Sequence, residues 1–359
     1  MKIAIVTGGT GGHIYPALSL AEALIKDDST NSIFFIGNED RMEAIEIPKY
    51  GFLFYGLPSK GFNGGLTEKF KALSALFKSR KLAKEILIKE KPDVVIGFGG
   101  YVTVPVIMMA HSLGIWTMIH EQNSVVGKAN KVLMRRVDAI VASYEQNLTV
   151  FPKSKTRLLG NPRTYALKYK NHQSQLVNYG FKSNTQTLLI VMGSLGSESI
   201  NAFMKSALLE LQNHKIQIVY ATGKKHYNEF NKGNPFKSNV RIEPYINQID
   251  LMYEVDLMIT RGGATTAAEI AVIGCPSIII PSPYVPNNHQ YYNAKALVDH
   301  QACLLIEEKD LELKSFCTTV LETLNDKEGL KQMSMNAKSI AMPNAAEDMI
   351  QWIKNRNYD

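Results

Sequence analysis

The chain has 359 residues, of which 45% are hydrophobic, so it can bury a sizeable core and is not disordered as a whole. Its 40 Lys and Arg outnumber its 33 Asp and Glu, and the formal net charge of +7 favours anionic partners such as nucleic acid, acidic lipid or phosphorylated small molecules. The three cysteines (Cys275, Cys303 and Cys317) form no C-x-x-C pair, which argues against a disulfide framework or a cysteine zinc site and for a reducing compartment.

The beginning of the chain carries no secretory signal, because the apolar run Met1–Val6 is short and meets glycines at once. The best candidate for a membrane span, Val102–Ile119, is interrupted by Pro105, His111 and Gly114. No stretch approaches the roughly 20 apolar residues that a spanning helix needs. The sequence therefore predicts a soluble cytoplasmic protein, or one that only touches a membrane surface.

Short runs rich in β-branched residues alternate with helical patterns, such as Pro16–Lys26 and Ser199–Gln212, along almost the whole chain. Short buried strands with helices between them are typical of parallel sheets covered on both faces. The first set of predicted strands is Lys2–Thr7, Ser32–Ile36, Val94–Gly97, Trp116–Ile119 and Ala139–Ala142. The second set is Thr187–Met192, Ile216–Ala221, Val240–Ile242, Asp256–Thr260, Ser277–Pro281 and Cys303–Ile306.

The two sets of strands repeat one plan, in which a buried strand runs into a glycine-rich turn and then a helix. Between them, Gly160–Arg163 breaks the periodicity and a polar stretch follows, so we place the linker near residues 160–165. The sequence thus predicts an α/β protein of two Rossmann-like, doubly wound parallel-sheet domains, residues 1–162 and 163–343. Ligands of open α/β sheets bind at the carboxyl ends of the strands, so we expect the domains to face a deep cleft that holds a small molecule.

Four glycine-rich loops follow predicted strands, and the helix after such a loop presents free N–H groups that suit a diphosphate or an anionic sugar group. The first loop is not the dinucleotide fingerprint, because the last glycine of G-x-G-x-x-G is replaced by Ile14, and no P-loop occurs. An ordinary tight turn explains some loops of this kind, but four of them indicate a large polar ligand. The loops are Gly8–His13, Gly97–Tyr101, Gly193–Ser197 and Arg261–Thr266.

Polar residues add to these loops. His120–Asn123 and Asn287–Gln290 supply imidazole and amide groups of the kind that recognise sugar hydroxyls. Glu269, one helical turn beyond the fourth loop, could bind ribose hydroxyls or simply complement the helix dipole as a first-turn acid. No Asp-x-Asp occurs, so helix N-termini must take the role of a metal on a nucleotide diphosphate, and we expect no metal site and no cofactor.

Taken together, seven segments resemble one known family, the bacterial peptidoglycan N-acetylglucosamine transferases that convert lipid I to lipid II. The matches run in order from residue 8 to residue 294 and cover both predicted domains. The matching segments are Gly8–His13, Gly97–Tyr101, His120–Asn123, Gly160–Arg163, Gly193–Gly196, Arg261–Glu269 and His289–Ala294. The family often has a serine at position 262 and a glutamine at position 195, where this chain has Gly262 and Leu195.

The resemblance implies a GT-B fold with an N-terminal acceptor domain and a C-terminal donor domain. It implies inverting transfer of N-acetylglucosamine from UDP-N-acetylglucosamine to the 4-hydroxyl of undecaprenyl-diphospho-N-acetylmuramoyl-pentapeptide, in a β-1,4 linkage. A UDP-sugar 2-epimerase of the same fold is the alternative. A dinucleotide oxidoreductase lacks its glycine pattern here, and a nucleic-acid binder is suggested only by charge.

The resemblance also implies roles for individual residues. Loop amides around Ser194 would hold the diphosphate, the Ile246 main chain would read the uracil edge, and Glu269 would hold the ribose. Gly99, Gly100 and Tyr101 would bind the acceptor. The remaining donor-site residues would be Thr10, Gly11, Gly12, Asn123, Arg163, Ala264, Thr265, Thr266 and Gln290.

Transfer needs a base for the acceptor hydroxyl, and His13, at the junction of a glycine loop and a helix, is our first choice. His13 could instead only cap or hydrogen-bond the loop. The alternative base system is His120 with Glu121, because a carboxylate partner can raise the basicity of an imidazole.

The segment 69–91 has eight Lys or Arg against Glu85 and Glu90, with apolar residues at helical spacing. Such a helix is either packed with a solvated charged face or docks on an anionic leaflet, and a lipid-linked acceptor favours docking. We therefore expect a peripheral protein on the cytoplasmic side of the cell membrane. The predicted membrane-facing residues are Phe70, Leu73, Leu76, Phe77, Lys78, Arg80 and Lys81.

The end of the chain predicts one more helix. Apolar residues recur at helical spacing over 344–357, and Pro343 would end the helix before it. In a GT-B fold this helix packs back on the N-terminal domain. The resemblance further implies UDP-N-acetylglucosamine and lipid I as substrates, the anionic inner leaflet as a surface partner, and a cell-wall synthesis complex as a protein partner.

Overall fold

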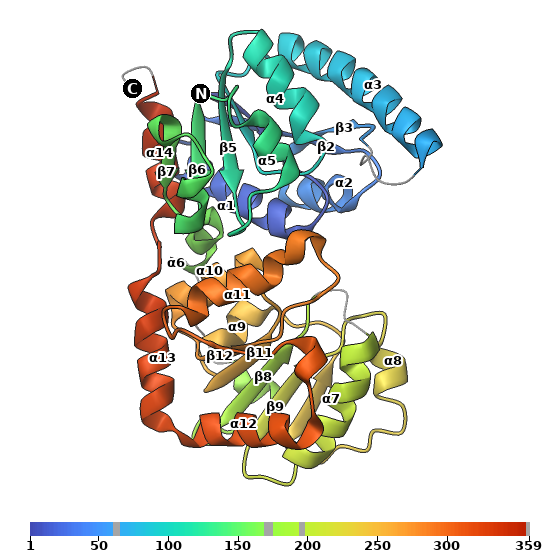
Figure 1. The fold of residues 1–359 in the computed structure, drawn as a ribbon, viewed down its shortest axis with the longest axis vertical. Coiled ribbons are helices and arrows are strands. Elements are labelled where there is room, and N and C mark those ends of the chain that lie inside the picture. The colour runs from blue at the N-terminus through green and yellow to red at the C-terminus, as the bar shows by residue number, and fades with distance from the viewer. Residues whose placement is uncertain (60–64, 169–174, 194–197, 357–359) are drawn as a thin grey trace. The chain divides into compact units, whose positions relative to one another are not determined.

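The computed structural model describes residues 1–59, 65–168, 175–193 and 198–356, without the side chains of residues 66–71, 198 and 199. The chain forms two compact units, residues 1–168 with 342–359, and residues 169–341 (Figure 1). The sequence predicts domain boundaries at 162/163 and 343/344. In the structure, residues 163–168 belong to the first unit and not, as predicted, to the second. The short helices in this stretch, Pro162–Thr164 and α6 (Tyr165–Lys168), contact the first long helix, α1 (Gly11–Asp27), which explains the difference.

A parallel sheet of seven strands forms the centre of the first unit, in the order β3-β2-β1-β4-β5-β6-β7. The central pairs, such as Ile3 with Val94 and Ile5 with Ile96, are apolar and fully buried. In sheet order the strands are Leu53–Leu57, Ser32–Asn38, Lys2–Val6, Val94–Gly97, Trp116–Glu121, Ala139–Ala142 and Thr156–Leu158.

Helices cover both faces of this sheet (Figure 1). Ile3 and Ile5 of β1 point into a core shared with α1 and α14 (Ala345–Lys354), whereas Ala4 and Val6 point into a core shared with α3, α4 and α5. This alternation follows from the two-residue period of a strand. The other helices of the unit are α2 (Met42–Glu46), α3 (Leu66–Glu90), α4 (Thr103–Ser112) and α5 (Lys128–Leu133).

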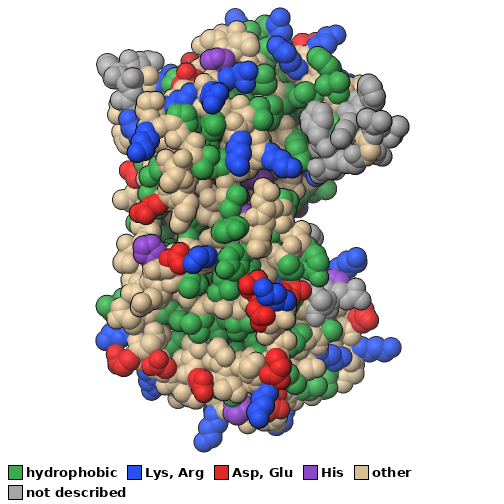
Figure 2. All heavy atoms as spheres, in the orientation of Figure 1, with side chains coloured by type: hydrophobic (Ala, Val, Ile, Leu, Met, Phe, Trp, Pro, Cys, Tyr) green, Lys and Arg blue, Asp and Glu red, His purple; other side chains and the backbone are tan. Residues whose placement is uncertain are grey.

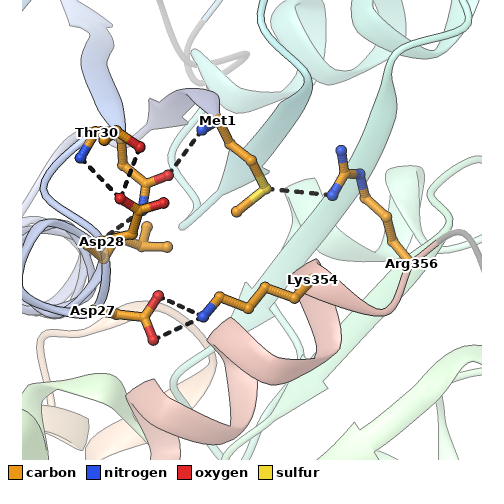
Figure 3. A network of polar contacts seen from close by, with 8 residues as sticks. Met1, Asp27, Asp28, Thr30, Lys354 and Arg356 are labelled. Carbon is orange, nitrogen blue, oxygen red and sulfur yellow. Dashed lines mark hydrogen bonds and ion pairs between the residues drawn. The ribbon is translucent and has the colours of Figure 1, made fainter.

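The last helix, α14, is part of the first unit because its apolar face completes the core beside α1. Met349, Ile350 and Ile353 are buried there, and the Arg157 guanidinium lies 4.3 Å from the centre of the Trp352 ring. Polar contacts hold the end of the helix, as Figure 3 shows. Lys354 Nζ lies 2.8 Å from Asp27 of α1, and Arg356 contacts the Sδ of Met1.

The second unit has a parallel sheet of six strands in the order β10-β9-β8-β11-β12-β13. Leu188 and Ile190 of β8 pack against apolar residues of α7 and α12. In sheet order the strands are Val240–Glu243, Gln217–Ala221, Thr187–Val191, Leu257–Thr260, Ser277–Ile279 and Leu304–Leu305. The helices α7 to α13 are Glu198–Leu211, Tyr227–Phe230, Gln248–Met252, Ala264–Ile273, His289–Val298, Leu313–Asn325 and Lys327–Ser339.

The sequence missed two strands, β3 and β7, and both are edge strands of the first sheet. An edge strand is not buried on both faces, and the partly exposed β3 and the three-residue β7 lack the continuous apolar run that marks the central strands. All three cysteines are buried and free. Among the described residues, no helix is both long enough and apolar enough to cross a membrane.

Candidate functional site

The three glycine loops that the structure describes in full lie at the points where each sheet reverses its strand order. β1 and β4 are neighbours at the reversal in the first sheet, and they lead into the loops at Gly8–His13 and Gly97–Tyr101. β8 and β11 are neighbours at the reversal in the second sheet, and β11 leads into the loop at 261–266, whereas residues 194–197 of the third predicted loop lie outside the described residues. In open α/β sheets these positions are where ligands bind.

The first loop turns sharply between β1 and α1. Gly9 has a φ of +101°, and its N–H donates to Glu43 Oε2 at 3.2 Å. Thr10 is the N-cap of α1 with an extended backbone, and its side chain makes no capping hydrogen bond. Thr10 is exposed and Gly11 and Gly12 are partly exposed, so the first turn of the helix is accessible to a ligand.

His13 bridges the first two loops. Its Nδ1 lies 3.0 Å from the Gly8 carbonyl oxygen, and because a carbonyl only accepts, Nδ1 is the nitrogen that carries the proton. Its Nε2 side faces the second loop, where a Cβ added at Gly99 would lie 2.9 Å from Nε2. His13 thus hydrogen-bonds the first loop, as one interpretation of the sequence expected, and its role as a base stays a prediction.

The second loop packs directly on the first. A Cβ at Gly100 would lie 2.6 Å from the Gly8 carbonyl oxygen, so only glycine fits there, with a φ of +85°. Thr103 Oγ1 donates to the Gly99 carbonyl oxygen at 2.6 Å, and Gln122 Nε2 donates to the Phe98 carbonyl oxygen at 2.7 Å. Tyr101 projects from this loop with 40% of its surface exposed.

His120 is a buried structural residue in β5, which extends through Glu121 and so beyond the predicted end at Ile119. Its Nε2 lies 2.9 Å from the Gly160 carbonyl oxygen, and its buried Nδ1 has no hydrogen-bond partner. Burial lowers the pKa of His120 to about 4, the Gly160 hydrogen bond opposes this, and the nearby His13 adds to it. An imidazole with a pKa this low is a weak base, and burial encloses its ring.

Glu121 organises the loop after β5 and does not pair with His120. Its carboxylate accepts from the Gly127 N–H at 2.8 Å, from Asn130 Nδ2 at 2.9 Å and from the Asn123 N–H at 3.1 Å. Burial raises the pKa of the Glu121 carboxyl, against the lowering effect of these hydrogen bonds. Glu121 therefore gives His120 no carboxylate partner in this structure, because consecutive strand residues point to opposite faces of the sheet.

Two further predicted donor residues lie in the first unit. Asn123 Nδ2 lies 3.4 Å from Glu121 Oε1, so its amide is oriented by that carboxylate. The Arg163 guanidinium lies 5.3 Å from the centre of the Tyr15 ring on α1. Arg163 also lowers the pKa of the Glu22 carboxyl, although burial has the larger effect and raises it.

In the second unit, the fourth loop packs tightly on α11. A Cβ at Gly262 would lie 2.2 Å from the Gln290 carbonyl oxygen, so this geometry requires the glycine that stands where the family often has serine. Asn293 Nδ2 donates to the Gly262 carbonyl oxygen at 3.1 Å. Gln290 accepts through Oε1 from the Ser282 N–H at 2.9 Å, which leaves its amide nitrogen as the part able to donate to a ligand.

Glu269 lies on the second turn of α10, because the helix begins at Ala264, so it is not the first-turn acid that the sequence offered as an alternative. Glu269 is only 2% exposed as a residue, and its carboxylate accepts from Gln248 Nε2 at 2.6 Å. The same Gln248 nitrogen lies 3.2 Å from Thr266 Oγ1, and the buried Thr265 Oγ1 has no partner.

An ion pair holds the base of the fourth loop. Arg261 Nη1 lies 2.8 Å from Glu308 Oε2, and both side chains are largely buried. Ile246 follows β10, and its side chain is 7% exposed. Ser194 lies outside the described residues, and so does the side chain of Phe70.

The predicted membrane-facing residues lie on α3. Phe77 is 64% exposed and Leu73 is 42% exposed one turn earlier, while Leu76 is half-buried. Lys78, Arg80 and Lys81 are exposed. Figure 2 shows Lys and Arg side chains spread over the first unit on the face that it draws. Among the described residues no group of three or more His, Cys, Asp or Glu side chains could hold a metal ion.

Two family models match the chain in order. The glycosyltransferase family 28 N-terminal domain matches residues 3–142, and the C-terminal domain of the same family matches residues 187–349. The chain belongs to glycosyltransferase family 28. The two matches fall one on each sheet, so the family 28 assignment covers the loops at both reversal points.

Curated family 28 relatives match over nearly the full chain. A protein of Halalkalibacterium halodurans is 40% identical over 361 residues and covers 99% of both chains, and one of Listeria monocytogenes is 38% identical and covers 98% of both. Both are named UDP-N-acetylglucosamine–N-acetylmuramyl-(pentapeptide) pyrophosphoryl-undecaprenol N-acetylglucosamine transferase.

Solved structures agree with the GT-B architecture of family 28. The crystal structure of Acinetobacter baumannii MurG has a TM-score of 0.77 at 26% identity and covers 99% of both chains. The UDP-N-acetylglucosamine 2-epimerase of Neisseria meningitidis has a TM-score of 0.69 at 15% identity, with coverage of 99% and 100%. At that identity the second likeness shows the fold alone.

Sequence reasoning missed three residues that hold the loops: Glu43, Gln248 and Glu308. None of them stands in a glycine-rich motif. Each reaches its loop from a segment at least 18 residues away in the chain, as the Gln248–Thr266 contact illustrates. No sequence pattern marks these three residues, because their contacts with the loops come from the fold.

Proposed function

We propose that this chain transfers N-acetylglucosamine from UDP-N-acetylglucosamine to the 4-hydroxyl of undecaprenyl-diphospho-N-acetylmuramoyl-pentapeptide, giving lipid II and UDP. The observation that carries the proposal is the identity of 36–40%, over nearly the whole chain, to curated relatives that bear the name of this transferase. The loops at both sheet reversals support it, because the reaction needs one set of groups for the nucleotide sugar and another for the acceptor.

The donor is assigned to the second unit. The N-terminus of α10 offers free N–H groups to an anion, and Ala264, Thr265 and Thr266 form its first turn. Glu269 is oriented by Gln248, so its carboxylate can accept from ribose hydroxyls. Gln290 can donate to the sugar, and Ser194 with its neighbouring amides completes the diphosphate site, with Ile246 on the uracil.

The acceptor and the base are assigned to the first unit. His13 donates its Nδ1 proton to the Gly8 carbonyl oxygen, and we assign its Nε2 side, which faces Gly99, to the acceptor hydroxyl. We assign the acceptor to Gly99, Gly100 and Tyr101, because Gly99 faces the Nε2 side of the His13 ring and the other two follow it in the same loop. An α-linked donor and a β-linked product require one direct displacement, in which His13 removes the proton as the acceptor oxygen attacks the anomeric carbon and UDP departs.

The lipid-linked acceptor calls for contact with a membrane, and α3 is our candidate surface. Phe77 and Leu73 stand one turn apart on its exposed side, with Arg80 and Lys81 beside them. Apolar side chains surrounded by cations suit an anionic leaflet, which the proposal places on the cytoplasmic side of the cell membrane.

Incubation with radiolabelled UDP-N-acetylglucosamine and a short-chain lipid I analogue tests the reaction. We expect label in the lipid product with an equal amount of UDP released. Release of UDP or formation of an epimeric sugar without labelled lipid would favour the epimerase and overturn the proposal.

The assignment of His13 is tested by His13→Ala in the same assay. A lost general base lowers turnover by about a hundredfold or more. The matched control is His111→Ala, which removes an exposed imidazole from the last turn of α4. Near-normal turnover of His13→Ala would remove His13 from the mechanism.

A further inference from the structure

Glu43 is a buried carboxylate that none of the roles above uses. It lies on the short helix α2, and its side chain has no exposed surface. Three N–H groups surround it: those of Gly9 at 3.2 Å and Asn38 at 3.0 Å from the main chain, and Asn38 Nδ2 from the side chain. Among the described residues no cation forms an ion pair with it. A buried carboxylate is costly unless it is well hydrogen-bonded, so its position calls for an explanation.

The surrounding backbone leaves room for this carboxylate. A Cβ at Gly8 would lie 2.7 Å from Glu43 Oε1, and a Cβ at Gly37 would lie 2.7 Å from Glu43 Cγ. Gly8 is the first residue of the first loop, which follows β1, and Gly37 lies in the neighbouring strand β2. The two glycines thus allow the carboxylate to lie directly against the first loop.

One peptide group joins Glu43 to His13. The Gly9 N–H that donates to Glu43 and the Gly8 carbonyl that accepts from His13 Nδ1 belong to the same peptide unit. Hydrogen bonds in such a chain polarise one another, so an anionic acceptor on the N–H makes the carbonyl oxygen a stronger acceptor. The result is a carboxylate–peptide–imidazole chain.

We propose that Glu43 is a positioning residue for His13, acting through the Gly8–Gly9 peptide to fix the proton on Nδ1 and to strengthen Nε2 as a base. The inference rests on the proposed function only in assigning the base role to His13. A carboxylate that hydrogen-bonds an imidazole directly has the same effect on its tautomer and basicity. Here the peptide group stands between the two.

Other charged groups around α1 act differently. His120 of β5 interacts with His13, but burial lowers the pKa of His120 so that it stays neutral at physiological pH. Arg163 lies over Tyr15 and interacts with Glu22. Lys354 of α14 pairs with Asp27 at the far end of α1. Glu43 is an anion that a continuous hydrogen-bonded path links to the His13 ring.

The test replaces Glu43 with Gln in the full chain and follows the His13 ring by NMR as a function of pH. We expect the titration midpoint of His13 to fall, and the acid limb of the kcat/KM profile for transfer to move to lower pH with it. The KM for UDP-N-acetylglucosamine should stay unchanged, while kcat falls about tenfold to a hundredfold, as for other lost partners of a working imidazole. The control is Glu46→Gln, on the same helix but paired with Lys49.

Two further measurements test the link between Glu43 and His13. In a His13→Ala background, Glu43→Gln should lower turnover no further, because the residue acts only through the imidazole. In the unmodified protein, the Gly9 amide resonance should follow the titration of His13, which requires no variant to fold. An unchanged His13 midpoint in Glu43→Gln, or a Gly9 amide that ignores the His13 titration, would overturn the proposal. Both NMR results stand even if the transfer reaction itself is refuted.

Discussion

His120 and Glu121 are consecutive residues of β5, yet they share no hydrogen bond and serve different segments of the first unit. The His120 ring hydrogen-bonds the Gly160 carbonyl oxygen. The Glu121 carboxylate instead accepts from the main-chain N–H groups of Asn123 and Gly127 and from Asn130 Nδ2. His120 therefore connects the end of β5 to the segment at Gly160, and Glu121 connects it to the loop that follows β5.

The buried His120 predicts a pH dependence of stability. The unfolded imidazole takes up a proton near pH 6.5, but burial lowers the pKa in the folded protein to about 4. This contribution to stability is present above pH 6.5 and is lost as the pH falls toward 4, by about 3 kcal/mol in total. Urea unfolding followed by tryptophan fluorescence measures it, since both tryptophans (Trp116 and Trp352) lie in the first unit. A His120→Gln variant with the same pH dependence as the unmodified protein would contradict the assignment.

The hydrogen bonds of the Glu121 carboxylate predict that the stability of the loop after β5 depends on this one side chain. Glu121→Gln replaces an acceptor oxygen with an amide nitrogen and leaves the Gly127 N–H or Asn130 Nδ2 without a partner. We expect a loss of about 1–3 kcal/mol in the free energy of unfolding. Glu145→Gln, at an exposed position, is the matched control and should change stability by less than about 0.5 kcal/mol. Equal effects of the two variants would show that the Glu121 contacts contribute nothing.

The close packing of Gly262 on α11 predicts that a larger side chain at position 262 destabilises the fourth loop. Gly262→Ser places a Cβ against the Gln290 carbonyl oxygen and should destabilise the second unit by about 1–3 kcal/mol, as overpacking does. The neighbouring Gly263→Ser is the control, because the nearest atom to its Cβ is Thr266 Oγ1 at 3.8 Å and serine is a good N-cap. Thermal unfolding and UDP affinity of the two variants give the comparison. Equal stabilities of the two variants would contradict the prediction, because they would show that α11 shifts to accommodate the serine at position 262 without loss of stability.

The exposed face of α3 predicts binding to anionic vesicles that weakens with salt. Phe77→Ser and Lys81→Glu should each lower the affinity by about tenfold, the first by removing buried apolar area and the second by changing charge. Val177→Ser is the control, since Val177 is 65% exposed on the second unit and Phe77 is 64% exposed. Equal binding to neutral and anionic vesicles in a sedimentation assay would count against the electrostatic part.

The sequence by itself determined the two parallel sheets and the places of the glycine loops. Strands buried on both faces, such as Val94–Gly97, read as continuous apolar runs, and the glycines at their ends mark turns that no other residue adopts easily. Those signals are local. The edge strands β3 and β7 lack them, which is why they were missed.

Only the tertiary structure decided what the polar residues do. Whether His120 is a base or a buried support depends on Gly160, 40 residues away, and the tie between Glu43 and Gly9 spans 34 residues. Burial and hydrogen-bond partners set the protonation and orientation of such groups, and both come from segments that no sequence pattern brings together. The sequence therefore predicts where the glycine loops lie, and the tertiary structure sets the burial and hydrogen-bond partners of the polar side chains around them.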